Sequence, residues 1–243
     1  MNLTNANPAP EGPAARPSDR TSSSRVTHES ARPPGAQLEL SDVTVEPALL
    51  DGFGWERVFP GRGDRPIELE IGTGKARFLL HRARSMQQHC FLGIEWANEF
   101  YRFAADRMAR WGVRNVRMLR TDAGVFVRTV CPRRSLTALH IYHPDPWPKA
   151  RHHKRRLFQP AFVSAAAECL VDGGRMFVQT DHAEYFTIIA GLLRNHPDLA
   201  AVPFEPDLAE RPGAAAIGTN FEEKYIREGR SIHRIAVERR PRL

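Results

Sequence analysis

The sequence predicts an α/β protein with a mostly parallel, twisted sheet, helices on both faces and an antiparallel edge strand. Short apolar runs of β type alternate with amphipathic stretches of helix length. Such alternation implies right-handed βαβ crossovers, which place consecutive strands parallel and cover both faces of the sheet with helices. A last apolar run follows a long irregular segment and is expected to pair antiparallel at an edge.

The elements follow in order along the chain. Strands are predicted at 67–71, 91–95, 116–119, 136–142 and 176–180. Helices are predicted at 76–86, 98–111, 123–130, 158–170 and 183–195. The last of these helices is expected to end before Pro197, and the edge strand is expected at 232–237.

Positive charge is concentrated in one short part of the chain. The 243 residues carry a formal charge of +7, with a sequence pI near 9.8. Five Lys or Arg and no acid lie between Lys149 and Arg156. The basicity is therefore expected as a local patch, which suits a nucleic acid, a membrane surface or an acidic small substrate.

The N-terminal segment, the cysteines and the lack of long apolar runs indicate the domain organisation and the compartment of the protein. Residues 1–36 hold six prolines and no aromatic residue, which predicts a disordered N-terminal tail before a single domain at 37–243. Cys90, Cys131 and Cys169 have no metal or disulfide spacing, as expected of a reduced, cytoplasmic protein. The first residues show no positive stretch that leads into an apolar run, and no apolar run reaches about 18 residues, so we expect a soluble, cytosolic protein without a membrane partner.

A stiff loop follows the fourth predicted strand. Prolines at 144, 146 and 148 each fix φ and remove a backbone donor, so this segment cannot continue a helix or form a central strand. The loop holds Asp145 and Trp147 beside the basic run. Groups that are already held in place lose little entropy when a substrate binds, so this loop is suited to form the wall of a pocket. The alternative is a solvated surface turn, which has the same composition.

A glycine turn closes the first strand. Gly72 and Gly74 allow a tight turn and close approach of a ligand to the backbone. A dinucleotide-binding fingerprint would have glycine at 77, where this chain has Arg77, which argues against a pyrophosphate at this helix. Glu70 precedes the turn and suits a ligand that is cationic or rich in donors.

Acids lie at or just after the ends of four successive predicted strands: Glu70, Glu95, Asp122 and Asp145. The carboxyl ends of parallel strands meet at one edge, so these acids are expected in one crevice. Glu95 lies 21 residues after Gly74, a spacing typical of an acid that accepts hydrogen bonds from ribose. Asp122 equally fits a plain helix N-cap. A nucleoside-binding crevice lined by acids favours S-adenosylmethionine over NAD or ATP, because carboxylates repel the phosphates of NAD and ATP.

Several motifs together resemble the bacterial tRNA (guanine-N7)-methyltransferase family in order and spacing over about residues 45–240. They are Glu-Ile-Gly-Thr-Gly-Lys at 70–75, Gly-Ile-Glu at 93–95, Asp-Ala at 122–123, Pro-Asp-Pro-Trp-Pro-Lys at 144–149, the basic run at 151–156, Thr-Asp at 180–181 and Thr-Asn-Phe-Glu-Glu-Lys-Tyr at 219–225. The chain differs from the family at Ala76, where a third glycine is usual, and at Asn220, where lysine is frequent.

The resemblance implies a Rossmann-like class I methyltransferase that moves a methyl group from S-adenosylmethionine to guanosine N7 in tRNA, at position 46 of the variable loop. It implies Asp145 as the catalytic residue. The donor site would comprise Glu70, Gly72, Gly74, Glu95, Asp122 and Asp145. The tRNA site would comprise Lys149, Arg151, His152, His153, Lys154, Arg155, Arg156, Asp181, Thr219, Asn220, Phe221 and Glu222. The expected protein is cytoplasmic, metal-free, and a monomer or weak homodimer.

The chemistry of guanine agrees with these assignments. N7 has a free lone pair at neutral pH, so transfer needs alignment rather than a general base. A fixed carboxylate such as Asp145 or Asp181 can stabilise the cationic product, while Trp147 either stacks on the base or supports the loop. The alternatives are a class I methyltransferase for a small molecule or protein, and a non-catalytic RNA-binding protein with a degenerate domain. A dinucleotide oxidoreductase fits least well.

Overall fold

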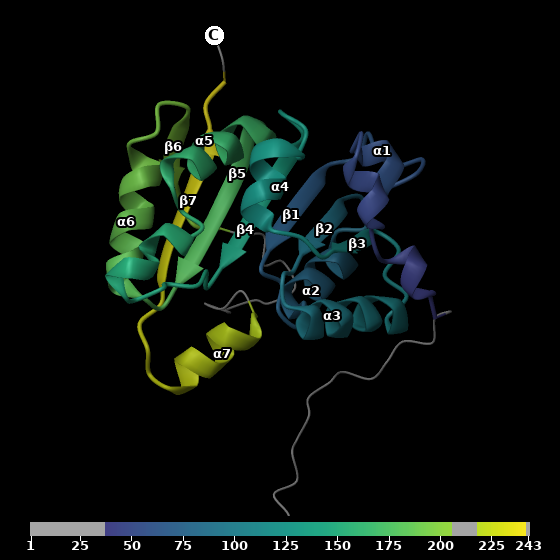
Figure 1. Cartoon of the computed structure of the whole chain (residues 1–243), viewed down its shortest axis with the longest axis horizontal. Coiled ribbons are helices and arrows are strands. Elements are labelled where there is room, and N and C mark those ends of the chain that lie inside the picture. The colour runs from purple at the N-terminus through teal and green to yellow at the C-terminus, as the bar shows by residue number, and fades with distance from the viewer. Residues whose placement is uncertain (1–36, 206–217, 242–243) are drawn as a thin grey trace, which may run out of the picture. The chain divides into compact units, whose positions relative to one another are not determined.

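The computed structural model describes residues 37–205 and 218–241. In these residues seven strands form one sheet in the order β3-β2-β1-β4-β5-β7-β6 (Figure 1). β1 to β5 run parallel to one another, while β7 pairs antiparallel with both β5 and β6. The strands are β1 Ile67–Ile71, β2 Cys90–Ile94, β3 Val116–Leu119, β4 Leu136–Tyr142, β5 Leu170–Thr180, β6 Leu199–Val202 and β7 His233–Arg239.

Helices connect the strands as βαβ crossovers require. Pro160 begins α5 at a position where a missing N–H costs nothing, and Thr219 caps α7 by accepting a hydrogen bond from the Glu222 N–H. The α-helices are α1 Trp55–Val58, α2 Arg77–Ser85, α3 Asn98–Arg110, α4 Ala123–Thr129, α5 Pro160–Cys169, α6 Ala183–Arg194 and α7 Asn220–Arg227. The 3-10 helices are η1 Leu40–Asp42, η2 Pro47–Leu50 and η3 Ala150–Arg155.

Two hydrophobic clusters lie on opposite faces of the sheet. Ile67, Leu69 and Ile71 of β1 pack in a cluster with residues of α4, α5 and α6. Phe91 of β2 and Met118 of β3 pack in a second cluster with α2 and α3. The alternation of side chains along each strand thus divides the apolar residues between two layers of helices, which gives a Rossmann-like fold.

The predicted architecture is confirmed, with three differences. β7 is antiparallel, as expected, but it is not the edge strand, because β6 pairs with its outer side. β5 begins at Leu170, six residues before the predicted start, and α7 lies in the segment expected to be irregular. The tail predicted at 1–36 lies outside the described residues.

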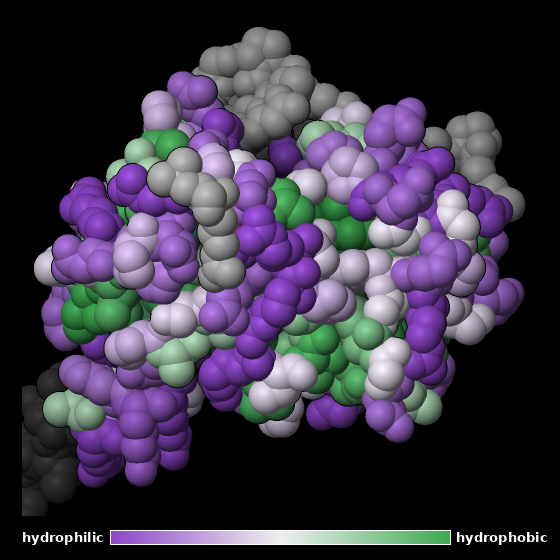
Figure 2. Space-filling view, turned by 90° about the horizontal axis from the view of Figure 1, so that it is seen from above, coloured by the Kyte–Doolittle hydropathy of each residue, from purple (hydrophilic) through white to green (hydrophobic). Residues whose placement is uncertain are grey.

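One face of the molecule is mostly polar. On the face shown in Figure 2, hydrophilic side chains predominate and hydrophobic residues lie between them in small groups. Among residues 37–205 and 218–241, every helix is too short or too polar to cross a membrane.

Candidate active site

A pocket of about 500 Å³ opens where the parallel strands end. Its lining comes mainly from the glycine turn after β1, the segment after β2, the start of α4 and the loop after β4, with Phe100 of α3 and Arg155 of η3 in addition. Gly72, Gly74, Glu95, Asp122 and Asp145 all line it, so the structure brings these five predicted donor-site residues together.

The glycine turn is fixed by the second strand. Gly72 and Gly74 have φ of 75° and 52°, a region in which residues with side chains are strained. Glu95 accepts hydrogen bonds from the N–H of Gly74 at 2.8 Å and of Ala97 at 2.9 Å. Ala76 also lies at a positive φ, 50°, with its methyl group buried, so the conformation that usually requires glycine persists here with alanine.

Glu70 lies deeper than the other acids. Its side chain is buried, and its Oε2 has no hydrogen-bond partner among the described residues. Burial, together with the nearby charge of Glu95, raises the pKa of Glu70 well above its ordinary value. A buried carboxyl oxygen without a partner is costly unless a ligand supplies the missing donor.

Asp122 has the capping role that the sequence left open. Its Oδ1 accepts a hydrogen bond from the Val125 N–H at 2.8 Å, which satisfies one free donor at the start of α4. The same residue lines the pocket, so the cap and a ligand contact are compatible.

The loop after β4 is held in a strained conformation. His143 and Trp147 have φ of 54° and 42°. Arg156 donates a hydrogen bond from Nε to the Pro146 carbonyl at 2.7 Å, and its guanidinium lies 4.8 Å from the ring centroid of Tyr185. Asp145 is exposed on this loop. Backbone strain from such positive φ angles persists only where the surrounding residues hold the backbone in place. It is found most often at functional sites.

Arg156 departs from its predicted role. It is only 4% exposed and its guanidinium is engaged inside the protein, so it is not positioned to bind a phosphate. Its neighbours in the basic run are different, because they are exposed: Lys149, Arg151, Lys154 and Arg155. His152 and His153 are partly buried.

Trp147 is in contact with the basic run. The Arg155 guanidinium lies 5.1 Å from the centroid of the indole ring, and the His152 ring meets the indole edge-on with centroids 5.8 Å apart. Both Trp147 and Arg155 line the pocket. The indole therefore links the pocket wall to η3.

A second polar cluster joins the end of β5 to α7 and β7. Asp181 accepts a hydrogen bond from Arg230 at 2.8 Å and lies 3.5 Å from His143. Partial burial alone would raise the pKa of Asp181, but hydrogen bonds from Arg230 and His143 outweigh it and lower that pKa. His143, which also lines the pocket, therefore connects the pocket to this cluster.

Glu222 and Thr219 complete the cluster. Glu222 is fully buried, accepts from the Gly218 N–H at 2.8 Å, and pairs with Arg234 at 2.8 Å. Arg234 also donates to Gln179 Oε1 at 2.8 Å. The side chains of Asn220 and Phe221 lie outside what the structure describes. The roles of Arg230, Arg234 and His143 were missed by sequence reasoning, because arginines near the C-terminus and a histidine before a proline carry no local signal.

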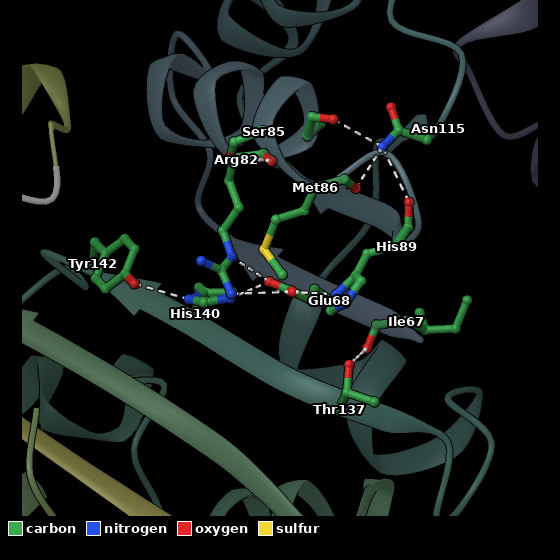
Figure 3. A network of polar contacts seen from close by, with 11 residues as sticks. Ile67, Glu68, Arg82, Ser85, Met86, His89, Asn115, Thr137, His140 and Tyr142 are labelled. Atoms are coloured by element: carbon green, nitrogen blue, oxygen red, sulfur yellow. Dashed lines mark hydrogen bonds and ion pairs between the residues drawn. The ribbon is translucent and has the colours of Figure 1, made fainter. Parts of the chain in front are cut away.

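A buried network lies on β1 beside the pocket. Figure 3 shows Glu68 between the side chains of Arg82, His89 and His140. His140 Nε2 lies 2.8 Å from Glu68 Oε2, and His140 Nδ1 lies 2.8 Å from the hydroxyl of Tyr142, a residue that lines the pocket. Burial lowers the pKa of His140, so the neutral ring donates to Glu68 and accepts from Tyr142.

Comparison with known proteins decides the family. A family model described as "Putative methyltransferase" matches residues 64–235. A "tRNA (guanine-N(7)-)-methyltransferase" of Levilactobacillus brevis is 32% identical over 190 residues, which cover 78% of this chain and 86% of the relative. The chain belongs to the tRNA (guanine-N7)-methyltransferase family. A relative of the same name from Nitrosomonas europaea is 35% identical, over 81% of this chain and 84% of its own.

Solved structures with similar folds include TrmN from Thermus thermophilus, at a TM-score of 0.49 and 17% identity, with 80% of this chain and 49% of that chain covered. As a tRNA (guanine-N7)-methyltransferase family member, the protein is an enzyme of the methyltransferase class. Its pocket fits S-adenosylmethionine because the carboxylates that line it suit a ligand without phosphates. Glu70 is not part of the lining, but its unpartnered oxygen lies one residue before Ile71, which is, and suits a hydrogen-bond donor.

Proposed function

We propose that this enzyme transfers a methyl group from S-adenosylmethionine to N7 of a guanosine in tRNA, and that the acceptor is the variable-loop guanosine. One observation carries the proposal: His143, two residues before Asp145, lies between the acid-lined pocket and the cluster around Asp181. A donor in the pocket and a base at the cluster would therefore meet at the Asp145 loop.

The donor would be held by the residues that line the pocket. S-adenosylmethionine supplies an electrophilic methyl group on a positively charged sulfur. Each oxygen of Glu95 already accepts one backbone hydrogen bond and retains a lone pair, which can accept a ribose hydroxyl. Glu70 would take a donor from the ligand on its unpartnered oxygen. Asp122 and the backbone of Gly72 and Gly74 would complete the site.

The acceptor base would be oriented by Asp181 and by residues Thr219 to Glu222, and Lys149 would contribute as the family resemblance implies. The low pKa of Asp181 keeps it ionised at neutral pH, so it can accept hydrogen bonds from the amino edge of guanine. Because N7 needs no deprotonation, the enzyme gains most by aligning N7 with the methyl group. The exposed carboxylate of Asp145 would stabilise the positive charge that reaches the purine.

The exposed cations of η3 would bind the phosphates around this guanosine. We expect that replacing Arg151, Lys154 and Arg155 with alanine lowers the salt dependence of tRNA binding by about 0.7 to 0.9 log units per lost contact. The control is Arg194→Ala, which removes a single exposed charge, from the end of α6. An unchanged slope in a filter-binding titration would show that η3 does not contact RNA.

The position of the modification is tested with tRNA transcripts and a labelled methyl donor. We expect the wild-type enzyme to label a transcript and to lose labelling when the variable-loop guanosine is replaced by adenosine. Asp145→Ala should bind the donor, retain its circular dichroism spectrum and lose transfer. Full labelling of the adenosine transcript would disprove the position, and wild-type transfer by Asp145→Ala would show that Asp145 is structural.

We also expect activity without a metal and a monomer or weak homodimer. Activity that persists in EDTA, and sedimentation at the monomer mass at low concentration, would support these two expectations. Loss of activity in EDTA that zinc or magnesium restores would contradict the first of them.

A further inference from the structure

A chain of polar contacts connects α7 to His143 through the interior of the protein. Arg234 of β7 donates from Nη2 to Glu222 Oε1 at 2.8 Å and from Nε to Gln179 Oε1 at 2.8 Å. Gln179 of β5 continues the chain, because its Nε2 lies 3.0 Å from His143 Nε2. The backbone joins the same two residues, since the His143 N–H donates to the Gln179 carbonyl at 2.6 Å. Glu222 and Gln179 are fully buried, so water does not compete for their contacts.

The contacts with Arg234 fix the orientation of the Gln179 amide. An arginine side chain has five N–H donors and no acceptor, so the atom of Gln179 that faces Arg234 must be the oxygen. The amide nitrogen of Gln179 therefore faces His143. Because an amide NH₂ group donates and does not accept, Nε2 of His143 must be the acceptor of this hydrogen bond.

The orientation of the amide in turn fixes the position of the ring proton of His143. Burial lowers the pKa of His143, which favours the neutral ring. A neutral imidazole has one N–H and one acceptor nitrogen, so with Nε2 as the acceptor the proton lies on Nδ1. Nδ1 lies 3.5 Å from Oδ1 of Asp181. At this distance an N–H attracts the carboxylate, whereas the lone pair of the other tautomer would repel it.

The carboxylate of Asp181 is thus held by two donors. Arg230 donates to Oδ2 at 2.8 Å, while Nδ1 of His143 faces Oδ1. Each oxygen keeps a lone pair, so the carboxylate can still accept hydrogen bonds from a base. A carboxylate that is fixed by one donor alone can rotate about its Cβ–Cγ bond. The direction in which Asp181 presents its oxygens therefore depends on His143.

We propose that Gln179 is a positioning residue for methyl transfer. Held by Arg234, Gln179 keeps the proton of His143 on Nδ1, and His143 then orients the carboxylate of Asp181 toward the guanine base. This inference rests on the proposed function, in which Asp181 binds that base. Because Gln179 is fully buried, it acts through His143 and Asp181 and not by contact with the substrate.

The test uses the full chain with Gln179→Met. Methionine has a similar length and no N–H group, so this variant removes the donor that faces His143. The matched control is Asn115→Leu, which removes another buried amide, one that donates to three backbone carbonyls at and just after the end of α2. Asn115 precedes β3, at the end of the sheet opposite the pocket, so its loss should not reach His143.

The tautomer is measured directly. Long-range proton–nitrogen NMR spectra of protein labelled in its histidines report which ring nitrogen carries the proton, and the His143→Asn spectrum identifies the His143 signals by their loss. We expect the proton on Nδ1 in the wild type and in Asn115→Leu. In Gln179→Met the ring should no longer be fixed in that tautomer.

Kinetics show whether the tautomer matters for transfer. We expect Gln179→Met to lower kcat/KM for tRNA about two- to tenfold, the effect of one hydrogen bond, while the Kd for S-adenosylmethionine stays at the wild-type value. Asn115→Leu, compared at a temperature where it is folded, should keep the wild-type kcat/KM. A combined variant tests the route from Gln179 to Asp181.

The combined variant adds Gln179→Met to His143→Asn. Asparagine tolerates the positive φ of position 143 and has no ring proton for Gln179 to fix. Whatever the activity of His143→Asn is, the addition of Gln179→Met should change it by less than about twofold, because coupled residues give non-additive effects.

Three results would overturn the inference: a proton on Nε2 of His143 in the wild type, the same loss of kcat/KM from Gln179→Met in both backgrounds, or an equal loss in Asn115→Leu. A failure of the proposed function would appear separately. In that case the wild-type protein would yield no 7-methylguanosine, although its His143 carried the proton on Nδ1.

Discussion

Glu68 and Glu70 lie two residues apart on β1, so both side chains leave the strand on the same face, yet their surroundings are opposite. Both are buried. Glu68 has Arg82, His89 and His140 as partners, whereas Oε2 of Glu70 has none among residues 37–205 and 218–241. The comparison separates an acid whose partners lie within the fold from an acid whose missing partner the proposed methyl donor would supply.

The pKa shifts express the same contrast. Burial alone would raise the pKa of Glu68, but hydrogen bonds from His140 and His89 and the charge of Arg82 outweigh it, so that pKa lies well below its ordinary value. For Glu70, burial acts with the charge of Glu95, and the pKa rises well above its ordinary value. Burial with three partners therefore favours the ionised form of Glu68, whereas burial beside Glu95 favours the neutral form of Glu70.

The largest expected effect comes from removal of the charge at Glu68. Glu68→Gln would leave the guanidinium of Arg82 buried without its carboxylate, and removal of one partner from a buried ion pair typically costs about 3 to 5 kcal/mol. We expect a loss of this size in the free energy of unfolding, measured with urea. A loss below about 1 kcal/mol would mean that the network contributes little to the fold.

Glu70→Gln should instead affect ligand binding. A hydrogen bond to a neutral carboxyl contributes about 0.5 to 1.5 kcal/mol, so we expect the affinity for S-adenosylmethionine to fall about two- to tenfold in isothermal titration. The control is Glu68→Gln at a temperature where it remains folded, which should bind the donor more nearly as the wild type does. Unchanged donor affinity in Glu70→Gln would remove Glu70 from the donor site.

The pH dependence of stability sharpens the contrast further. An acid with a raised pKa in the folded state binds its proton more tightly when folded, so its contribution to stability falls as the pH rises from the unfolded pKa of about 4.3 through the folded pKa. Glutamine cannot ionise. The stability of Glu70→Gln relative to the ligand-free wild type should therefore increase across this window and level off above it.

Urea unfolding of Glu70→Gln and of the wild type, repeated at each pH, provides the measurement. Glu68 has the opposite sign, because its folded pKa is lowered: its contribution is present above about 4.3 and is lost as the pH falls through the folded pKa. A constant difference between Glu70→Gln and the wild type from pH 4 to 8 would show that Glu70 titrates normally.

The smallest expected effect tests where the Glu68 network ends. Tyr142→Phe removes the hydroxyl that bonds to His140 Nδ1 and leaves the ring in the pocket wall. We expect a loss of about 0.5 to 1.5 kcal/mol in unfolding free energy, the usual contribution of one hydrogen bond. A loss as large as that of Glu68→Gln would mean that the hydroxyl supports the whole network.

The parallel strands of the sheet could be predicted from the sequence, but its antiparallel edge strand β6 could not. β1 and β4 have the predicted bounds, because each is a short run rich in apolar residues that turn residues bound. β6 was missed since Leu-Ala-Ala-Val is too short and too weakly β-forming to be distinguished from a loop. Its pairing with β7 depends on contacts distant in sequence, which no local pattern shows.

At the candidate site, too, partners that are distant in sequence could not be predicted. Glu70 could be singled out because it precedes a glycine turn, but nothing in the alternation Ile-Glu-Leu-Glu-Ile shows that Glu68 has three partners and Glu70 an unpartnered oxygen. The burial of Arg156 was equally unpredictable from the sequence. In the sequence it is one more cation of the basic run, and only the fold shows that it lies buried against Pro146 and Tyr185.

The central claim is tested most directly by identification of the product. The protein is incubated with unmodified bulk tRNA and S-adenosylmethionine labelled in its methyl group, and the tRNA is then digested to nucleosides and separated. We predict that the label is found in 7-methylguanosine. Label in any other nucleoside, or no label in tRNA when the protein binds the methyl donor, would contradict the proposed function.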